Sequence, residues 1–536
     1  MKKLSFLLLT FASLISAKNA TSQDAIVADK NAAIVETVSG KVKGYTHNGI
    51  FNYKGIPYAK AERFTAPVKV NPWTGVRSSM SYGPVCPTDV TTTVNDEFEF
   101  PFQHNWGYTN ENCLTLNIWT KGINDQKKRP VMVWLHGGGF TAGSSIELPS
   151  YDGENLTKKG DVVVVSVNHR LNVLGFLDLS AYGEKYKSSA NAGLLDLVAA
   201  LQWVKQNIAN FGGDPENVTI FGQSGGGGKV TCLMNAPSAK GLFQKAIVQS
   251  GSYLVNFTEA AVTKRISAAL LEELQLQPSQ VDSLQKISYE RLNAAGKKAI
   301  AKVQQQIKAE GKPVEGFGLG WGPVLDGSFL PNQPGNPAAI ELSKNIPLLV
   351  GSTKNEFAPF IPGSRDMNMD QAKEFIKKKY GDNADKYMAA LNSAYPNTVK
   401  PSDFIDIDFM FRAGALRQAN MKAIPGAAPV YMYLFTWQSP VNNGMYKAMH
   451  CMDLAFQFDN ISRCQEMTGG GKEACELANK ISQAWINFAK NGDPNNKELP
   501  NWPKYTAENG ATMIFDNKCE IKNHHDQELI KIGTAK

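Results

Sequence analysis

The chain has 536 residues, of which 43% are hydrophobic and 20% are charged, a composition typical of a globular protein. Lys and Arg number 56 against 49 Asp and Glu, giving a formal charge of +7, and no dense basic block with interleaved aromatic residues occurs. This mild excess favours an ordinary solvated surface over nucleic-acid binding. A single core usually stops growing at about 250–300 residues, so length alone suggests more than one domain.

Residues 1–17 have the pattern of a secretory signal peptide. Two lysines give a positive start, residues 4–15 form an apolar run, and the small residues Ser16 and Ala17 precede the expected cut. The run is too short to span a bilayer comfortably, and no other stretch reaches about 18 uninterrupted apolar residues. The alternative is a buried N-terminal helix or anchor. We expect residues 18–536 to be secreted, periplasmic or extracellular, without stable membrane insertion, and the short Lys-Lys start is typical of a bacterial source.

Seven cysteines fit an oxidising compartment, and their odd number leaves at least one unpaired. Cys86 and Cys113 bracket a polar segment that a disulfide could close. Cys464 and Cys475 flank a glycine-rich loop and could also pair, whereas Cys232 lies in an apolar context typical of a buried thiol. The remaining two cysteines stay ambiguous. No close Cys/His quartet occurs, so a metal site is not expected.

Short apolar, β-branched runs recur along the chain with helical patterns between them. The expected strands are residues 131–135, 162–167, 218–221, 246–249, 346–350 and 430–435. Most are nearly continuous in apolar residues, as in strands covered by helices on both faces. Residues 194–210 and 475–490 have apolar side chains at helical spacing. This alternation predicts a doubly wound α/β fold with a largely parallel central sheet.

Two regions differ from this alternation. Residues 33–39, 41–45 and 114–119 are typical of hairpin strands, and we expect them to form an antiparallel edge of the main sheet. The segment of about 260–320 is rich in Lys, Gln and Glu with scattered apolar positions, which indicates exposed helices forming a cap-like insertion. No repeat or low-complexity linker divides the chain. We therefore predict one large domain over residues 18–536.

The run GQSGG at residues 222–226 fits the G-x-S-x-G pattern. The pattern alone is weak, but here an expected strand precedes it and a glycine-rich helix start follows, as a nucleophile elbow requires. The sharp turn would expose the Ser224 hydroxyl above the strand's carboxyl end, where the helix N-terminus favours developing negative charge. A phosphate-binding loop is the alternative. Lys229 is followed by Val230 where that motif needs Ser or Thr, and the glycine spacing differs.

The run HGGGF at residues 136–140 directly follows the expected strand 131–135. Acyl transfer creates an oxyanion that backbone N–H groups must face, and glycines leave such donors unobstructed. Each donor is typically worth about 10²–10³ in rate. Gly225, the residue after the predicted nucleophile, would add one more donor. His136 precedes the elbow in the chain, so we expect it to shape this loop and not to act as the base.

A serine hydroxyl needs a base, and the triad of this fold runs in the order Ser, acid, His. Beyond Ser224 the chain offers only His450, His524 and His525. The last two lie in a polar, surface-like run, so His450 is the predicted base.

The acid must orient this histidine and stabilise its charged form. Glu356 follows the expected strand 346–350 and lies at its carboxyl edge. Asp326 is the alternative, but it precedes Gly327 and is typical of a turn aspartate. Position therefore favours Glu356.

With these residues the sequence resembles the type-B carboxylesterase and cholinesterase family over residues 38–505. Its further marks are KGIPYA at 54–59, ENCLTLN at 111–117, NHR at 168–170, GLLD at 193–196, ALQWV at 200–204 and FGGDP at 211–215. The resemblance implies the α/β-hydrolase fold. It also implies roles for specific residues: Ser224 as nucleophile, Glu356 as acid, His450 as base, Gly138, Gly139 and Gly225 as oxyanion donors, and Cys86 with Cys113 as a disulfide.

The sequence departs from the family pattern beside the nucleophile. The family usually has Glu before it and Ala after it, where this chain has Gln223 and Gly225. Gly225 still supplies its N–H, although a glycine backbone is freer. Trp106 lies between Cys86 and Cys113 but nearer the second cysteine than the choline-binding Trp of cholinesterases, so choline-ester specificity is not predicted.

The sequence thus predicts a serine carboxylic-ester hydrolase that acts on small-molecule esters through an acyl-enzyme and needs no metal or cofactor. One alternative is an inactive binding module on the same fold, which should lack at least one triad residue. The other is an amide or thioester hydrolase with the same triad.

Overall fold

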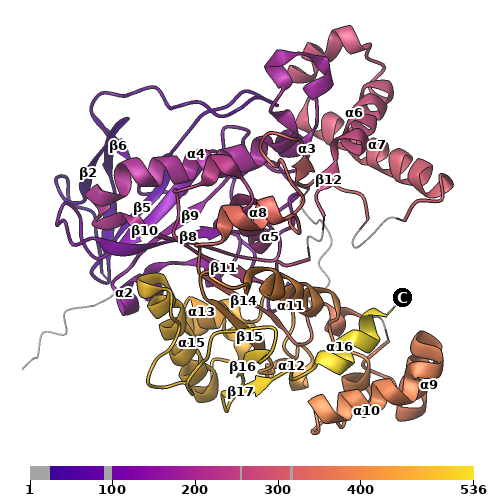
Figure 1. The fold of residues 1–536 in the computed structure, drawn as a ribbon. Helices are drawn as coiled ribbons and strands as arrows, with labels where there is room; N and C mark the ends of the chain where they lie inside the picture. The colour runs from indigo at the N-terminus through magenta and orange to yellow at the C-terminus, as the bar shows by residue number, and fades with distance from the viewer. Residues whose placement is uncertain (1–24, 90–98, 254–255, 314–317, 362, 536) are drawn as a thin grey trace, which may run out of the picture.

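The structure is a computed structural model that describes residues 25–89, 99–253, 256–313, 318–361 and 363–535 (Figure 1). The predicted signal peptide lies outside these ranges. The largest sheet in this part of the chain has 12 strands in the order β1-β4-β5-β7-β9-β8-β10-β11-β14-β15-β16-β17. No helix of the described ranges is both long and apolar enough to cross a membrane.

The centre of the sheet is parallel, from β9 through β16. Its strands are β9 (Val163–Val167), β8 (Arg129–Leu135), β10 (Gly213–Gln223), β11 (Lys245–Gln249), β14 (Leu348–Thr353), β15 (Val430–Phe435) and β16 (Ala511–Phe515). Every strand expected in this region is present. The predicted doubly wound α/β fold is confirmed, and it is the α/β-hydrolase fold.

Helices cover both faces of this sheet, which is why its strands are apolar at successive positions. Along β8, Val131 and Val133 pack in the same cluster as α4 (Ala192–Asn207), which matches the helix expected from residue 194. The intervening Met132 and Trp134 pack with α15 (Lys472–Asn491) on the other face. Figure 1 shows α4 and α15 on opposite sides of the strands.

The antiparallel edge differs from the prediction. It is formed by β1 (Ile26–Val27), β4 (Tyr45–His47), β5 (Ile50–Pro57) and β7 (Thr115–Thr120), and β17 (Glu520–Asn523) closes the other end. The expected strand 114–119 belongs to this edge, whereas of the expected strand 41–45 only Tyr45 does. The expected strands 33–39 and 41–45 instead supply β2 (Ile34–Thr37) and β3 (Gly40–Lys43), which join β6 (Val76–Ser78) in a separate three-stranded sheet.

The reason for this difference is a bend at Gly44. Its N–H donates to the Ala33 carbonyl at 2.9 Å, and a Cβ at Gly44 would overlap the Asn52 carbonyl oxygen. The run 41–45 is thereby split, with its first part in β3 and Tyr45 in β4. Periodicity alone does not show such a bend, because both halves keep strand geometry.

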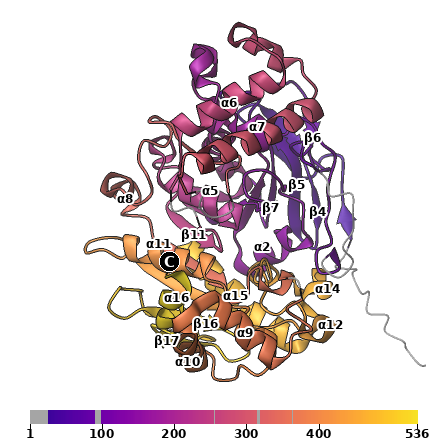
Figure 2. The same ribbon diagram turned by 90° about the vertical axis from the view of Figure 1, so that its right-hand side faces the viewer.

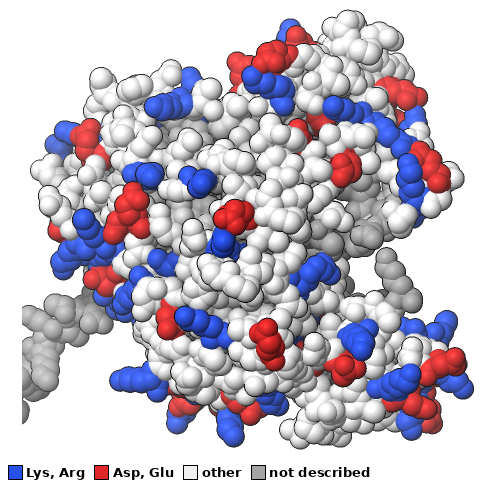
Figure 3. Space-filling view, in the orientation of Figure 1, with Lys and Arg blue, Asp and Glu red and all other residues white. Residues whose placement is uncertain are grey.

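The segment predicted as a cap contains α6 (Ala260–Glu273), the 3-10 helix η7 (Pro278–Gln285) and α7 (Tyr289–Ala309). Leu270, Ala299 and Val303 are buried where α6 and α7 meet. Figures 1 and 2 show these helices at one end of the molecule and α9 (Met369–Tyr380) with α10 (Ala384–Ala394) at the other. On the face in Figure 3 a notch separates the two ends, and acidic and basic side chains are intermixed.

A buried ion pair joins the end of β9 to α4. Arg170 donates from Nε and Nη2 to the two Asp196 carboxylate oxygens at 2.8 and 2.7 Å, and both side chains are almost fully buried. The backbone N–H of Arg170 also donates to Asp196, at 3.1 Å. The NHR and GLLD motifs are therefore two halves of one contact. It fixes the segment after β9, where the N–H of Asn172 donates to the Phe140 carbonyl at 2.8 Å.

Asp196→Asn is expected to lower the free energy of unfolding by about 3 kcal/mol or more, because it leaves the Arg170 guanidinium buried without a counter-charge. Denaturant unfolding followed by circular dichroism measures this change. Glu476→Gln is the control, since the Lys472–Glu476 pair is exposed and such pairs contribute about 0.5 kcal/mol or less. Equal effects of the two substitutions would contradict the argument.

Candidate active site

Ser224 lies at the turn between β10, which ends at Gln223, and α5 (Gly225–Met234). Its φ of 56° with ψ of −126° is a conformation that residues with a side chain rarely adopt. Two backbone hydrogen bonds hold the turn: Ser224 N–H donates to the Gln249 carbonyl at 2.8 Å, and Gly228 N–H donates to the Ser224 carbonyl at 3.0 Å. The structure thus has the strand–turn–helix arrangement expected of a nucleophile elbow.

The first turn of α5 is pressed against the loop that follows β8. A Cβ at Gly225 would overlap the Gly139 carbonyl oxygen, and a Cβ at Gly226 would overlap that of Leu135. Glycine is therefore the residue that fits at both positions in this structure. Gly225, which stands where the family usually has Ala, thus permits this close approach.

The loop at residues 136–140 contains Gly138 and Gly139 at φ of 82° and 62°, in the left-handed region that favours glycine. The Gly138 carbonyl accepts from the N–H groups of Thr141 at 3.3 Å and Ala142 at 3.0 Å. His136 is buried and its Nδ1 contacts the Gly137 carbonyl at 2.9 Å, in keeping with the loop-shaping role expected of it. Gly138 and Gly139 line the same cavity as Ser224.

His450 is paired with Glu356 at the carboxyl ends of β14 and β15. Its Nδ1 is hydrogen-bonded to Glu356 Oε2, and its backbone N–H donates to the Glu356 carbonyl at 2.8 Å. The other carboxylate oxygen of Glu356 accepts from Thr353 N–H at 2.8 Å, and the residue is fully buried. These contacts hold the imidazole with Nδ1–H on the carboxylate and leave Nε2 for proton transfer.

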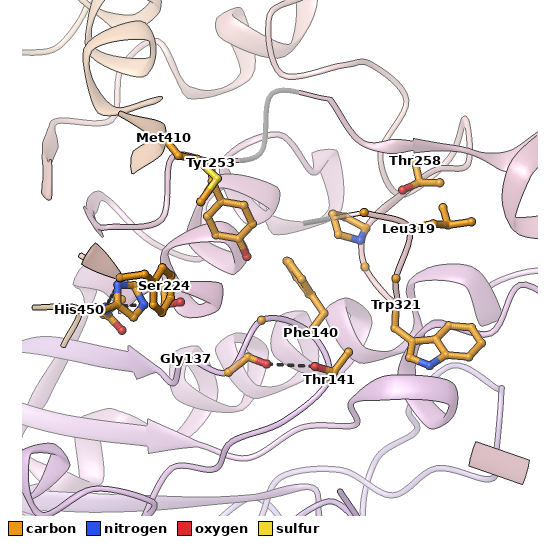
Figure 4. A pocket seen from close by; sticks show the side chains of 18 of the residues that line it. Gly137, Phe140, Thr141, Ser224, Tyr253, Thr258, Leu319, Trp321, Met410 and His450 are labelled. Atoms are coloured by element: carbon orange, nitrogen blue, oxygen red, sulfur yellow. Dashed lines mark hydrogen bonds between the residues drawn. The ribbon is translucent and has the colours of Figure 1, made fainter. Parts of the chain in front are cut away.

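Gln223 and Ser224 both lie close to this imidazole. The Gln223 amide nitrogen is 3.2 Å from His450 Nε2, while Ser224 and His450 line the same end of the cavity (Figure 4). Within the described residues no hydrogen bond joins Ser224 to His450. Catalytic hydrogen bonds are often long in unliganded enzymes and tighten when substrate binds.

Two further carboxyl groups lie near Glu356, those of the buried Asp453 and the half-buried Asp408, and neither was predicted from the sequence. Burial and the Glu356 charge raise the pKa of Asp453 to about 7 and that of Asp408 to about 8. Asp453 accepts hydrogen bonds from Tyr433 at 3.0 Å and Gln457 at 2.8 Å. A protonated Asp453 avoids a second negative charge beside Glu356. The closeness of Asp453 to His450 along the chain was the sequence feature that could have pointed to this residue.

The other residues that the sequence offered for the acid, the base and a choline-binding Trp lie away from Ser224. Asp326 holds a turn, accepting from Asn191 at 2.9 Å and from the N–H groups of Ser328 and Leu330 at 3.0 Å. The backbone carbonyl of Glu508 contacts His524, and the ring of Tyr395 contacts His525. Trp106 is 38% exposed and stacks on His104. None of Asp326, His524, His525 and Trp106 lines the cavity at Ser224.

The cysteines of the described residues are all unbridged. Cys86 and Cys113 are buried, and a hydrogen bond with the Cys86 thiol together with burial raises the pKa of Cys113. Cys464 is buried while Cys475 is exposed, and they do not pair. Cys232 is the buried thiol that its apolar context indicated.

The cavity in front of Ser224 has a volume of about 1290 Å³. Figure 4 shows Ser224 and His450 at one end, Leu319 and Trp321 at the other, and Phe140 between them. Its lining combines apolar side chains with a few charged ones: Phe102, Phe140, Tyr253, Trp321, Phe357, Met410, Glu147, Arg265, Lys312 and Arg417. In the described ranges no group of three or more His, Cys, Asp or Glu side chains is arranged to hold a metal ion.

The doubly wound sheet and the groups at its strand ends place the chain among the serine hydrolases of the α/β-hydrolase fold. The profile of the carboxylesterase family matches residues 31–532, nearly the whole chain. The chain therefore belongs to the carboxylesterase family and is a serine carboxylic-ester hydrolase.

Several known proteins are similar to this chain over most of its length. Para-nitrobenzyl esterase of Bacillus subtilis is 37% identical over 505 residues, covering 92% of this chain and 97% of the relative. Human cocaine esterase is 33% identical, covering 87% of this chain and 84% of its own. Among solved structures, an esterase from anaerobic Clostridium hathewayi that can hydrolyse aliphatic aromatic polyesters has a TM-score of 0.84 at 39% identity, covering 95% of this chain and 99% of that one.

The raised pKa of Asp453 predicts a pH-dependent stability. Above the usual carboxyl pKa of 3.8 the unfolded chain ionises this group, whereas the folded chain keeps the proton up to about pH 7. Unfolding then releases a proton, so the stability contributed by this group falls as pH rises through that window. We expect Asp453→Asn to reduce the drop in melting temperature between about pH 5 and about pH 8. An unchanged drop in the variant would show that Asp453 ionises normally in the folded protein.

Proposed function

We propose that Ser224 is the nucleophile of this esterase, His450 its general base and Glu356 the acid that orients the base. The hydrogen bond between His450 Nδ1 and the buried Glu356 carboxylate carries this assignment, because it aims Nε2 toward the turn that exposes Ser224. Gly138, Gly139 and Gly225 are the proposed donors to the oxyanion.

The reaction has two halves. Nε2 of His450 accepts the Ser224 proton while Oγ bonds to the ester carbonyl carbon, and the carbonyl oxygen becomes the oxyanion. The imidazolium returns the proton to the alkoxy oxygen as the C–O bond breaks, so that alcohol leaves and an acyl-serine remains. Water then attacks this acyl group, giving its proton to His450. The proton passes to Ser224 Oγ as the acid leaves.

A binding module without activity is not favoured, because Ser224, Glu356 and His450 are all present and gather at one edge of the sheet. Amide or thioester cleavage would use the same groups. The relatives with named substrates or reactions favour esters, from para-nitrobenzyl esterase to the polyester-hydrolysing enzyme.

The shape of the cavity supports a preference for esters with aromatic or extended groups. Phe140 and Tyr253 flank the path from Ser224, and Trp321 lies at the far end (Figure 4). Aromatic side chains add contact energy with ring-containing ligands beyond simple area burial. We propose that such organic esters, and not choline esters, are the substrates.

We further propose that the chain is the precursor of a secreted bacterial protein, cut after Ala17, with a disulfide between Cys86 and Cys113. The two thiols are buried and in hydrogen-bonding contact. The segment between them carries Phe102 and His104 to the cavity wall. A covalent bond at its ends would fix that wall in an oxidising compartment.

Ser224→Ala is expected to reduce kcat by about 10⁶-fold on nitrophenyl esters, to the background rate, because the acyl-enzyme cannot form. The kcat/KM of the wild type on nitrophenyl esters of increasing acyl length measures how much of the cavity the acyl group occupies. Ser250→Ala is the matched control, since Ser250 is a buried serine at the end of the adjacent strand β11, and it should keep nearly full activity. Substantial turnover by Ser224→Ala would contradict the proposed nucleophile.

The disulfide is tested on protein secreted from its full-length precursor. Alkylation of the unfolded protein is expected to modify two more cysteines after reduction than before, and peptide mapping should place them at Cys86 and Cys113. Cys86→Ala should lower the free energy of unfolding by about 3 kcal/mol, as expected for removing a native disulfide. The exposed Cys475 provides the control substitution to Ala. Full alkylation without reduction would overturn the pairing.

A further inference from the structure

Lys229, in the second turn of α5, is a fully buried lysine without an acidic partner. Its side chain is 0% exposed, and its Nζ donates to the His136 carbonyl oxygen at 2.9 Å. In the described part of the chain no carboxylate lies within ion-pair distance of it. Lysine is almost never fully buried unless it is paired, and an unpaired ammonium is costly to desolvate. Burial accordingly lowers the pKa of Lys229 to about 7.

The groups that act on this ammonium are two histidines and Glu147, whose charge raises the Lys229 pKa by less than burial lowers it. The buried rings of His136 and His169 stack at 5.2 Å, and their Nδ1 atoms contact the carbonyls of Gly137 and Arg170 at 2.9 and 2.8 Å. Burial holds the pKa of both imidazoles well below the usual range, so both are neutral. Nε2 of each ring is buried, and within the described residues it makes no hydrogen bond. The Phe140 ring centroid lies 5.8 Å from Lys229 Nζ.

The contact with His136 replaces a hydrogen bond that the sheet no longer supplies. The ladder between β8 and β10 ends at the Leu135–Gly222 pair, one residue before His136. Farther along the loop, backbone N–H groups hold the carbonyls of Gly138 and Phe140. Lys229 therefore holds the first carbonyl of the loop, at the point where the chain leaves the strand.

The same carbonyl lies against the helix that carries the lysine. A Cβ at Gly226 would be 2.9 Å from the His136 oxygen, which shows how closely the loop approaches the first turn of α5. The elbow and the loop are thus joined twice, by glycine contacts near Ser224 and by Lys229 one turn farther along. Movement of the His136 carbonyl would redirect the N–H groups of Gly138 and Gly139.

We propose that Lys229 is a positioning residue for the oxyanion loop: by holding the His136 carbonyl, it sets the direction of the glycine N–H groups that receive the oxyanion. The ammonium also adds a buried positive charge behind that loop, and charge in a low-dielectric site acts strongly. This inference rests on the proposed roles of Gly138 and Gly139. A buried lysine at a reaction centre is typical of a group retained for function at a cost in stability.

The test compares Lys229→Met and Lys229→Gln with the wild type. Methionine removes both the donor and the charge, whereas glutamine keeps a donor without the charge. Because the effect is on the transition state, we expect Lys229→Met to lower kcat by about ten- to a hundredfold with little change in KM. Ser224 adds to the carbonyl carbon of a trifluoromethyl ketone and so forms an oxyanion. The affinity of Lys229→Met for this inhibitor should fall in parallel with its kcat/KM. The kcat and ketone affinity of Lys229→Gln should lie between those of the wild type and those of Lys229→Met.

Lys422→Met is the matched control. Lys422 is also buried, has a pKa lowered by burial to about 8, and donates to a backbone carbonyl, that of Ser343, but lies outside the cavity lining. It should lose stability without losing kcat or ketone affinity. Rates are divided by the folded fraction from circular dichroism, so poor folding of one variant does not hide the result.

Unchanged kcat and ketone affinity in both Lys229 variants would overturn the proposal, as would an equal loss of kcat in Lys422→Met. The outcome is separable from that for the proposed function, because the wild type and Lys422→Met report esterase activity independently. If Lys229→Met does not fold, the ketone affinity and kcat of Lys229→Gln decide. A parallel loss supports the inference, and wild-type values contradict it.

Discussion

The active site depends on the contact of two backbones. The first turn of α5 lies against the loop after β8 so closely that side chains do not fit between them at Gly225 and Gly226. This approach brings a serine on one element within reach of N–H groups on another. It also requires the strained φ of Ser224, which a surrounding buried sheet can hold in place. The sheet interior therefore supplies the rigidity that the reaction geometry uses.

A second constraint concerns charge. Glu356 is fully buried beside Asp453 and Asp408, and three ionised carboxylates in that space would repel one another. The raised pKa values of the two aspartic acids favour their protonated forms, which lessens the repulsion around the carboxylate that is hydrogen-bonded to His450. On the opposite side, the Lys229 ammonium lies behind the oxyanion loop. Negative charge thus lies beside the base, where a proton is gained, and positive charge lies behind the loop that receives the oxyanion. Acyl transfer develops charges of these signs at these two places.

Much of the fold and of the candidate site was predicted from the sequence. The central strands were predicted because burial on both faces leaves a continuous apolar run, and the order of Ser224, Glu356 and His450 was enough to gather them at one edge. The antiparallel edge was predicted too, but not which strands form it, since the chain leaves one sheet and enters the other at Gly44 while both strands keep their pattern. The environments of Asp453 and Lys229 also escaped prediction. Each is set mainly by neighbours distant in sequence, His136 for Lys229 and Glu356 for Asp453, and only the closeness of Asp453 to His450 along the chain pointed to one of them.

The cavity has two walls of different origin. The strand ends provide Ser224 and His450, whereas much of the far wall comes from residues 256–313 and 318–323, which supply none of the proposed catalytic groups. Sequence change in that segment can alter which esters enter while the elbow, with its closely packed glycines, stays as it is. Substrate specificity and catalytic activity are therefore carried by different segments of the chain and can evolve separately. A recombined or replaced cap would give a new specificity in one step.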